Sequence, residues 1–141
     1  MKGLNPYLNF DGNAAEALRF YQSCLEGSKL MMQTFGEAPM ETPAELNERL
    51  MHGQLTYDNM CLMASDIMPD MPGQTFVVGT NVNLSLNLED QALQEKIFNK
   101  LAEGGTVTMP LQDTFWNARF GMLVDKFGIS WLLNCEKPSQ N

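Results

Sequence analysis

Aromatic and cationic side chains fall close together between residues 115 and 134 of this 141-residue chain. Trp116 and Arg119 lie in an apolar run that is followed by Asp125-Lys126-Phe127-Gly128 and by a second apolar run. This arrangement is typical of a β-hairpin. An indole can stack on a planar ligand, and a guanidinium can pair with an anionic group. The hairpin therefore predicts that Trp116 and Arg119 bind a ligand.

The two strands of this hairpin are expected to bring polar groups to one face. On that face we expect Asn117, Arg119, Ser130, Leu132 and Asn134. The alternative for Arg119 is a partly buried ion pair with a carboxylate of the same protein. The candidate partners are Asp58 and Asp125.

His52 is the only histidine, and Gln54 follows it at the spacing that places both on one face of a strand. An imidazole can act as an acid, a base or a metal ligand. A divalent metal site usually needs three or four His, Cys, Asp or Glu ligands, and this pair supplies one histidine and one amide. We therefore expect His52 and Gln54 to bind a ligand by hydrogen bonds, with no metal and no cofactor. A structural or solvent-facing role for His52 is the alternative.

Two other alternating runs place polar side chains on one face of a strand. Asn5 and Tyr7 alternate with apolar residues near the N-terminus, and Asn83 does so in a later run. We expect the apolar faces to pack against helices and the polar faces to line a ligand cavity. Contact with solvent is the alternative, because antiparallel sheets are often exposed on one side.

The elements that must position these residues occur twice in one order, strand, helix and three strands. The helices are expected at 13–25 and 90–102. Asn13 is expected to cap the first helix, with Glu16 three residues on in a capping-box arrangement. The strands are expected at 4–10, 29–34, 51–58, 60–64, 82–88, 106–109, 115–124 and 129–134. Two modules follow, at about 1–65 and 80–137, with a connector at about 66–79. Residues 36–50 are predicted to form an insertion with a short helix at 43–49.

Composition excludes several classes of protein. The net charge is −8, which disfavours binding to a nucleic-acid backbone. No apolar run approaches the roughly 20 residues that span a bilayer, and no signal peptide is evident. Cys24, Cys61 and Cys135 fit neither a disulfide framework nor a zinc site, so we expect a cytoplasmic protein with buried cysteines. The methionines in predicted strands either fill the core or form a soft wall around a hydrophobic ligand.

The chain resembles the PhnB-like branch of the vicinal-oxygen-chelate superfamily, which includes glyoxalase, extradiol dioxygenases and bleomycin and fosfomycin resistance proteins. The residues that carry the resemblance are Pro6-Tyr7-Leu8-Asn9-Phe10, Gly12-Asn13-Ala14, Glu16-Ala17, Phe20-Tyr21, His52-Gly53, Phe115-Trp116, Arg119, Asp125, Phe127-Gly128 and Trp131. The branch is often labelled by similarity to demethylubiquinone methyltransferase. The resemblance implies an α+β fold of two βαβββ modules, with a curved mixed sheet around a cup-shaped pocket, and a homodimer.

The resemblance also bears on metal binding. The positions that hold the metal in metal-dependent members carry Asn5, Gln54, Asn83 and Leu132 here. The position of the terminal carboxylate is therefore apolar, and no glycine-rich turn from strand to helix indicates a methyl-donor site. The sequence favours a metal-independent protein that binds a small molecule, with anionic molecules among the candidates. A metal-dependent lyase or isomerase of glyoxalase type and a non-catalytic interaction protein are the alternatives.

Overall fold

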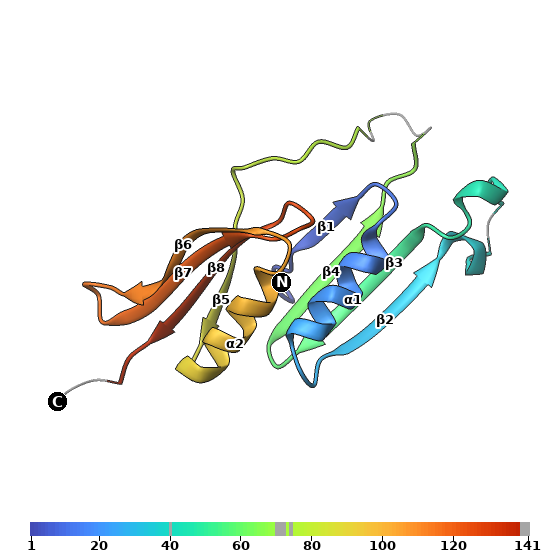
Figure 1. Cartoon of the computed structure of the whole chain (residues 1–141). Coiled ribbons are helices and arrows are strands. Elements are labelled where there is room, and N and C mark those ends of the chain that lie inside the picture. Colours follow the sequence, from blue (N-terminus) through green and yellow to red (C-terminus); the bar gives the residue numbers. More distant parts are fainter. Residues whose placement is uncertain (40, 70–72, 74, 139–141) are drawn as a thin grey trace. The chain divides into compact units, whose positions relative to one another are not determined.

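The computed structural model describes residues 1–39, 41–69, 73 and 75–138. They form two compact units, Met1–Val77 and Val78–Asn141 (Figure 1). Each unit holds one helix and one four-stranded sheet with the same strand order. The repeat predicted from the sequence is thus confirmed, as is the α+β class with two βαβββ modules.

The first unit, blue to green in Figure 1, contains sheet A. Its elements are β1 (Tyr7–Phe10), α1 (Ala14–Cys24), β2 (Lys29–Thr34), β3 (Leu50–Tyr57) and β4 (Met60–Asp66). The strand order is β1-β4-β3-β2, with β1 parallel to β4 and the other pairs antiparallel. Strand β1 pairs in parallel because α1 carries the chain back across the sheet before the next strand begins.

The second unit, yellow to red in Figure 1, contains sheet B with the matching order β5-β8-β7-β6. Its elements are β5 (Leu84–Leu88), α2 (Gln91–Leu101), β6 (Thr106–Asp113), β7 (Ala118–Val124) and β8 (Ser130–Glu136). Strand β5 pairs in parallel with β8, and the other pairs are antiparallel.

The core of each unit lies between its helix and one face of its sheet. In the first unit, the buried side chains of α1 include Leu18 and Tyr21, and β3 contributes Leu55. In the second unit, Ile97 of α2 and Trp131 of β8 are buried. Within the described residues, the opposite face of each sheet carries no α-helix of its own unit, and we call it the helix-free face.

Several predicted boundaries differ from the structure. Strand β1 begins at Tyr7 and β5 at Leu84, so Asn5 and Asn83 precede their strands. Phe115 and Trp116 lie in the turn between β6 and β7, not in a strand. The predicted short helix at 43–49 is a single 3₁₀ turn, Ala44–Leu46, and a second 3₁₀ turn occupies Phe35–Glu37. Such short turns are set by local hydrogen bonds that hydrophobic periodicity does not reveal.

Candidate functional site

The helix-free face of sheet A brings Tyr7, His52 and Gln54 together. The Tyr7 hydroxyl lies 3.2 Å from His52 Nδ1, and the two rings are 5.8 Å apart. Strand β4 separates β1 from β3, so the Tyr7 side chain reaches across β4 to make this contact. Three residues predicted from the sequence to bind a ligand therefore share one face.

The strand register places a row of side chains across this face. Tyr7 is opposite Met63, Met63 is opposite Gln54, and Gln54 is opposite Met31. Met31 is 61% exposed and Tyr7 is 45% exposed, so the row is open to contact. The sequence placed these methionines in strands but did not say which face they occupy. The structure places Met31 and Met63 beside Gln54, away from the core.

A bulge in β3 keeps His52 and Gln54 on this face. The register with β2 shifts between Gln33 and Thr34, so Gln33 is opposite His52 and Thr34 is opposite Leu50. The extra residue is Met51, which lets Leu50 remain buried while His52 points to the other side. On the helix side, Gly53 gives α1 room to approach the strand, because a Cβ there would overlap Leu18 Cδ1.

Arg119 does not lie where the sequence predicted. Its strand partner is Cys135, a buried residue on the helix side of sheet B. The Arg119 guanidinium lies 3.6 Å from Glu95 of α2, and its carbonyl accepts a hydrogen bond from Gln94 Nε2. The predicted face shared with Ser130, Leu132 and Asn134 is wrong, because these residues pair with Val124, Met122 and Phe120.

The cause of this difference is the geometry of the β7–β8 hairpin. Asp125 and Ile129 still pair, and Gly128 donates its main-chain N–H to the Asp125 carbonyl. The loop therefore has three residues and ends on Gly128, whose φ is +88°. With a loop of this length, odd-numbered residues of β7 pair with odd-numbered residues of β8. Arg119 therefore pairs with Cys135 and lies on the side of the sheet that faces α2. The ion pair left open for Arg119 exists, but its partner is Glu95 and not Asp58 or Asp125.

The helix-free face of sheet B carries apolar and amide groups. Phe120 and Asn134 are paired on this face, and the Trp116 ring lies 5.8 Å from that of Phe120. Trp116 is half exposed and also contacts Phe115 edge to face. Phe120 was not among the residues predicted to bind a ligand. The signal that could have identified it is an aromatic residue within a predicted strand.

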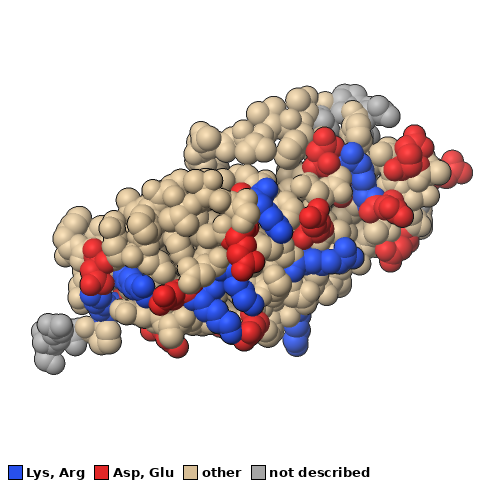
Figure 2. All heavy atoms as spheres, in the orientation of Figure 1, with Lys and Arg blue, Asp and Glu red and all other residues tan. Residues whose placement is uncertain are grey.

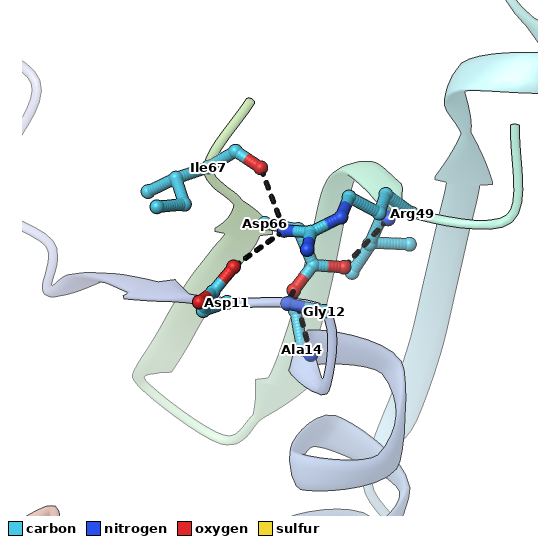
Figure 3. A network of polar contacts seen from close by, with 7 residues as sticks. Asp11, Gly12, Ala14, Arg49, Asp66 and Ile67 are labelled. Atoms are coloured by element: carbon cyan, nitrogen blue, oxygen red, sulfur yellow. Dashed lines mark hydrogen bonds and ion pairs between the residues drawn. The ribbon is translucent and has the colours of Figure 1, made fainter. Parts of the chain in front are cut away.

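Carboxylates occupy the N-termini of both helices. In the first unit, the buried Asp66 accepts hydrogen bonds from the main-chain N–H groups of Gly12, Ala14 and Leu50 (Figure 3). Asn13 makes no capping bond with its side chain, so the predicted capping box is wrong. In α2, the Asp90 side chain accepts a hydrogen bond from the main-chain N–H of Ala92. These N–H groups are therefore already used, although helix N-termini are common binding sites for phosphates.

The residues at the superfamily's metal positions do not fit a metal centre. Leu132 has no donor atom, and Asn5 and Asn83 lie before the first residues of β1 and β5. No group of three His, Cys, Asp or Glu side chains among the described residues could hold a metal ion. The amide and aliphatic side chains at these four positions are therefore a poor donor set for a divalent ion.

Cys135 lies in β8 of sheet B, where its thiol is hard to deprotonate. Burial raises the pKa of the Cys135 thiol, Asp90 raises it further, and Arg119 acts in the opposite direction. Cys135 in β8 is the counterpart of Asp66 in β4. Asp66 pairs with the last residue of β1, and Cys135 pairs with the last residue of β5. Cys24 and Cys135 are buried, as predicted, whereas Cys61 is partly exposed.

Comparisons with known proteins agree with this architecture. Residues 2–134 match the model of the 3-demethylubiquinone-9 3-methyltransferase family. Protein YjdN of Escherichia coli is 32% identical, and the match covers 97% of this chain and 99% of that protein. Protein PA1353 of Pseudomonas aeruginosa is 42% identical with a TM-score of 0.84, and the match covers 98% of this chain and 100% of that one.

The fold likeness extends further. A PhnB protein of Bacillus cereus is 27% identical over 95% of this chain and 99% of that one, with a TM-score of 0.73. A glyoxylase/bleomycin resistance protein/dioxygenase domain of Frankia is 13% identical, with a TM-score of 0.66 over 97% of this chain and 99% of that one, and shares the fold alone. The chain therefore belongs to the 3-demethylubiquinone-9 3-methyltransferase family, in its PhnB-like branch, and has the fold of the vicinal-oxygen-chelate superfamily.

Proposed function

We propose that this protein binds a small organic molecule on the helix-free face of sheet A, through hydrogen bonds and apolar contacts and without a catalytic metal. The observation that carries the proposal is the 3.2 Å contact between Tyr7 and His52 on this face. Polar groups held in place among exposed apolar ones are the usual composition of a ligand site.

The other residues expected to bind a ligand differ in how well their positions support such a role. Asn5 and Asn83 are exposed and lie next to β1 and β5, so each remains a proposed contact. Trp116 offers a half-exposed ring on the helix-free face of sheet B. Arg119 is left out, because its guanidinium pairs with Glu95 on the helix side.

Thermal denaturation in the presence of a panel of small metabolites tests the proposal. A ligand of the native state raises the melting temperature in proportion to the logarithm of its concentration, once that concentration exceeds the Kd. We expect such a ligand to act in the presence of EDTA and to act more weakly on Gln54→Leu. Gln22→Leu, which changes the same residue type on α1, serves as the matched control and should respond like the unaltered protein.

Two other outcomes favour the alternatives. Stabilisation that requires added nickel or zinc, and that His52→Ala abolishes, supports a metal-dependent lyase or isomerase of glyoxalase type. Stabilisation by no member of the panel supports an interaction protein with a vestigial site. The panel includes S-adenosylmethionine because the family description names methyl transfer. We expect no shift with it, since the sequence has no glycine-rich turn from strand to helix that would indicate a methyl-donor site.

We also propose a homodimer, as the resemblance to the superfamily implies. The proposal is supported by large apolar side chains that are exposed in one copy, including Phe115 at 97% and Val77 at 77%. Light scattering after size exclusion should give twice the 15.8 kDa of the chain. A mass of one chain at micromolar concentration would contradict this proposal. No described helix has the length and apolar character needed to cross a membrane, and the cytoplasmic location stays a prediction.

A further inference from the structure

We infer that the ligand of sheet A carries an acceptor oxygen, a carboxylate or a carbonyl, on a flat apolar body, and that His52 binds this oxygen through its Nε2–H. The inference rests on the proposed function and names the chemical class that the site takes. Three observations support it, namely the Tyr7–His52 contact, the charge of the face, and the methionines beside Gln54.

The Tyr7–His52 contact favours one position for the imidazole proton. A phenol hydroxyl is a good donor and its oxygen a poor acceptor, whereas an unprotonated imidazole nitrogen is a good acceptor. We therefore assign Tyr7 as the donor and His52 Nδ1 as the acceptor across the 3.2 Å that separates them. Neutral imidazole has one N–H, so the proton lies on Nε2. His52 then presents a donor on this face and not an acceptor.

The charge of the face matches an acceptor ligand. The strand residues on the helix-free face of sheet A, all within the described part of the chain, include no Asp or Glu. They are Tyr7, Asn9, Lys29, Met31, Gln33, His52, Gln54, Thr56, Cys61, Met63 and Ser65. The whole chain carries 17 acidic residues against 9 Lys and Arg. A face without carboxylates on so acidic a protein avoids repelling an anionic or electron-rich oxygen.

The apolar part of the ligand has its own contacts. Met31 and Met63 stand on either side of Gln54 in the register, and the Tyr7 ring lies in the same row. Thioethers and aromatic rings pack well against a flat apolar group. The Gln54 amide, between the two methionines, can add a second hydrogen bond to the same oxygen or to a neighbouring one.

The lone histidine makes the protonation state directly measurable. Because His52 is the only histidine, a long-range ¹H–¹⁵N spectrum at pH 8 contains one imidazole. We expect ¹⁵N shifts of the tautomer protonated on Nε2, and a shift toward a mixture of tautomers in Tyr7→Phe. Tyr57→Phe removes a phenol from the same unit and should leave the spectrum unchanged. An Nδ1-protonated imidazole in the unaltered protein would overturn the inference.

Benzoate and benzylamine test the class of ligand, since both have a flat ring and they differ in the polar group. We expect benzoate to move the His52 signals and the Met31 and Met63 methyl signals, and to bind about tenfold more tightly than benzylamine. Tyr7→Phe should weaken benzoate binding about fivefold, and Tyr57→Phe should not. Equal affinity for the two probes, or methyl shifts with unmoved His52 signals, would overturn the inference and leave the proposed function intact. No response to benzoate, together with no ligand in the thermal panel, would overturn both.

Discussion

At the scale of single residues, a buried carboxylate from a distant strand caps the N-terminus of α1, where the sequence indicates a cap by a neighbouring residue. Asn13 has the position and residue type of an N-cap, yet Asp66 from β4 takes the main-chain N–H groups of Gly12 and Ala14 (Figure 3). The same carboxylate accepts from Leu50 at the start of β3. A long-range cap of this kind could not be predicted, because it depends on which strand end meets the helix.

Asp66 should therefore contribute strongly to stability. We expect Asp66→Asn to lower the free energy of unfolding by about 2–3 kcal/mol, because the amide loses the charge and accepts fewer of the three N–H groups. Urea denaturation at pH 7 measures the change. Asp11→Asn is the control, since Asp11 is half exposed and its bond to Arg49 should be worth less than about 1 kcal/mol. Equal losses in the two variants would contradict this role for Asp66.

At the scale of elements, sequence periodicity predicted the helices and most strands but not every face. Both helices begin and end within one residue of their predicted bounds, because apolar residues recur at helical spacing. The face of Arg119 was missed since it depends on the number of residues in the β7–β8 loop. The strands were predicted to begin too early, before Asn5 and Asn83, because the alternation of apolar and polar residues starts before strand pairing does.

The close approach of each helix to its sheet depends on one glycine. A Cβ on Gly53 would meet Leu18 and Leu50 within 2.8 Å, and one on Gly121 would meet Phe98 and Leu111 within 2.9 Å. We expect Gly53→Ala and Gly121→Ala each to cost about 1–3 kcal/mol of stability through overpacking. Urea denaturation measures the change, and Gly79→Ala, where only Asn81 comes within 4 Å at 3.6 Å, should be nearly neutral. Neutral Gly53→Ala and Gly121→Ala variants would contradict this account of packing.

At the scale of the whole molecule, the duplicated module explains why the fold was predictable. The two units repeat one strand order, and each places its α-helix between its first and second strands. In the view of Figure 2, basic and acidic side chains lie near one another, and parts of the surface carry neither. The candidate site was less predictable, because it depends on which side chains share a face. His52, Gln54 and Tyr7 lie on one face, while Arg119 lies on the helix side of the other sheet.

We propose that the helix-free face of sheet A binds a small molecule. Methionine methyl spectra of the labelled protein, titrated with whichever metabolite raises the melting temperature, test it most directly. Met31 and Met32 are neighbours on β2 whose side chains lie on opposite faces, since Met32 approaches Gly53 on the helix side. We predict shifts for the Met31 and Met63 methyls and none for Met32. Unmoved Met31 and Met63 signals at saturating ligand would contradict the claim.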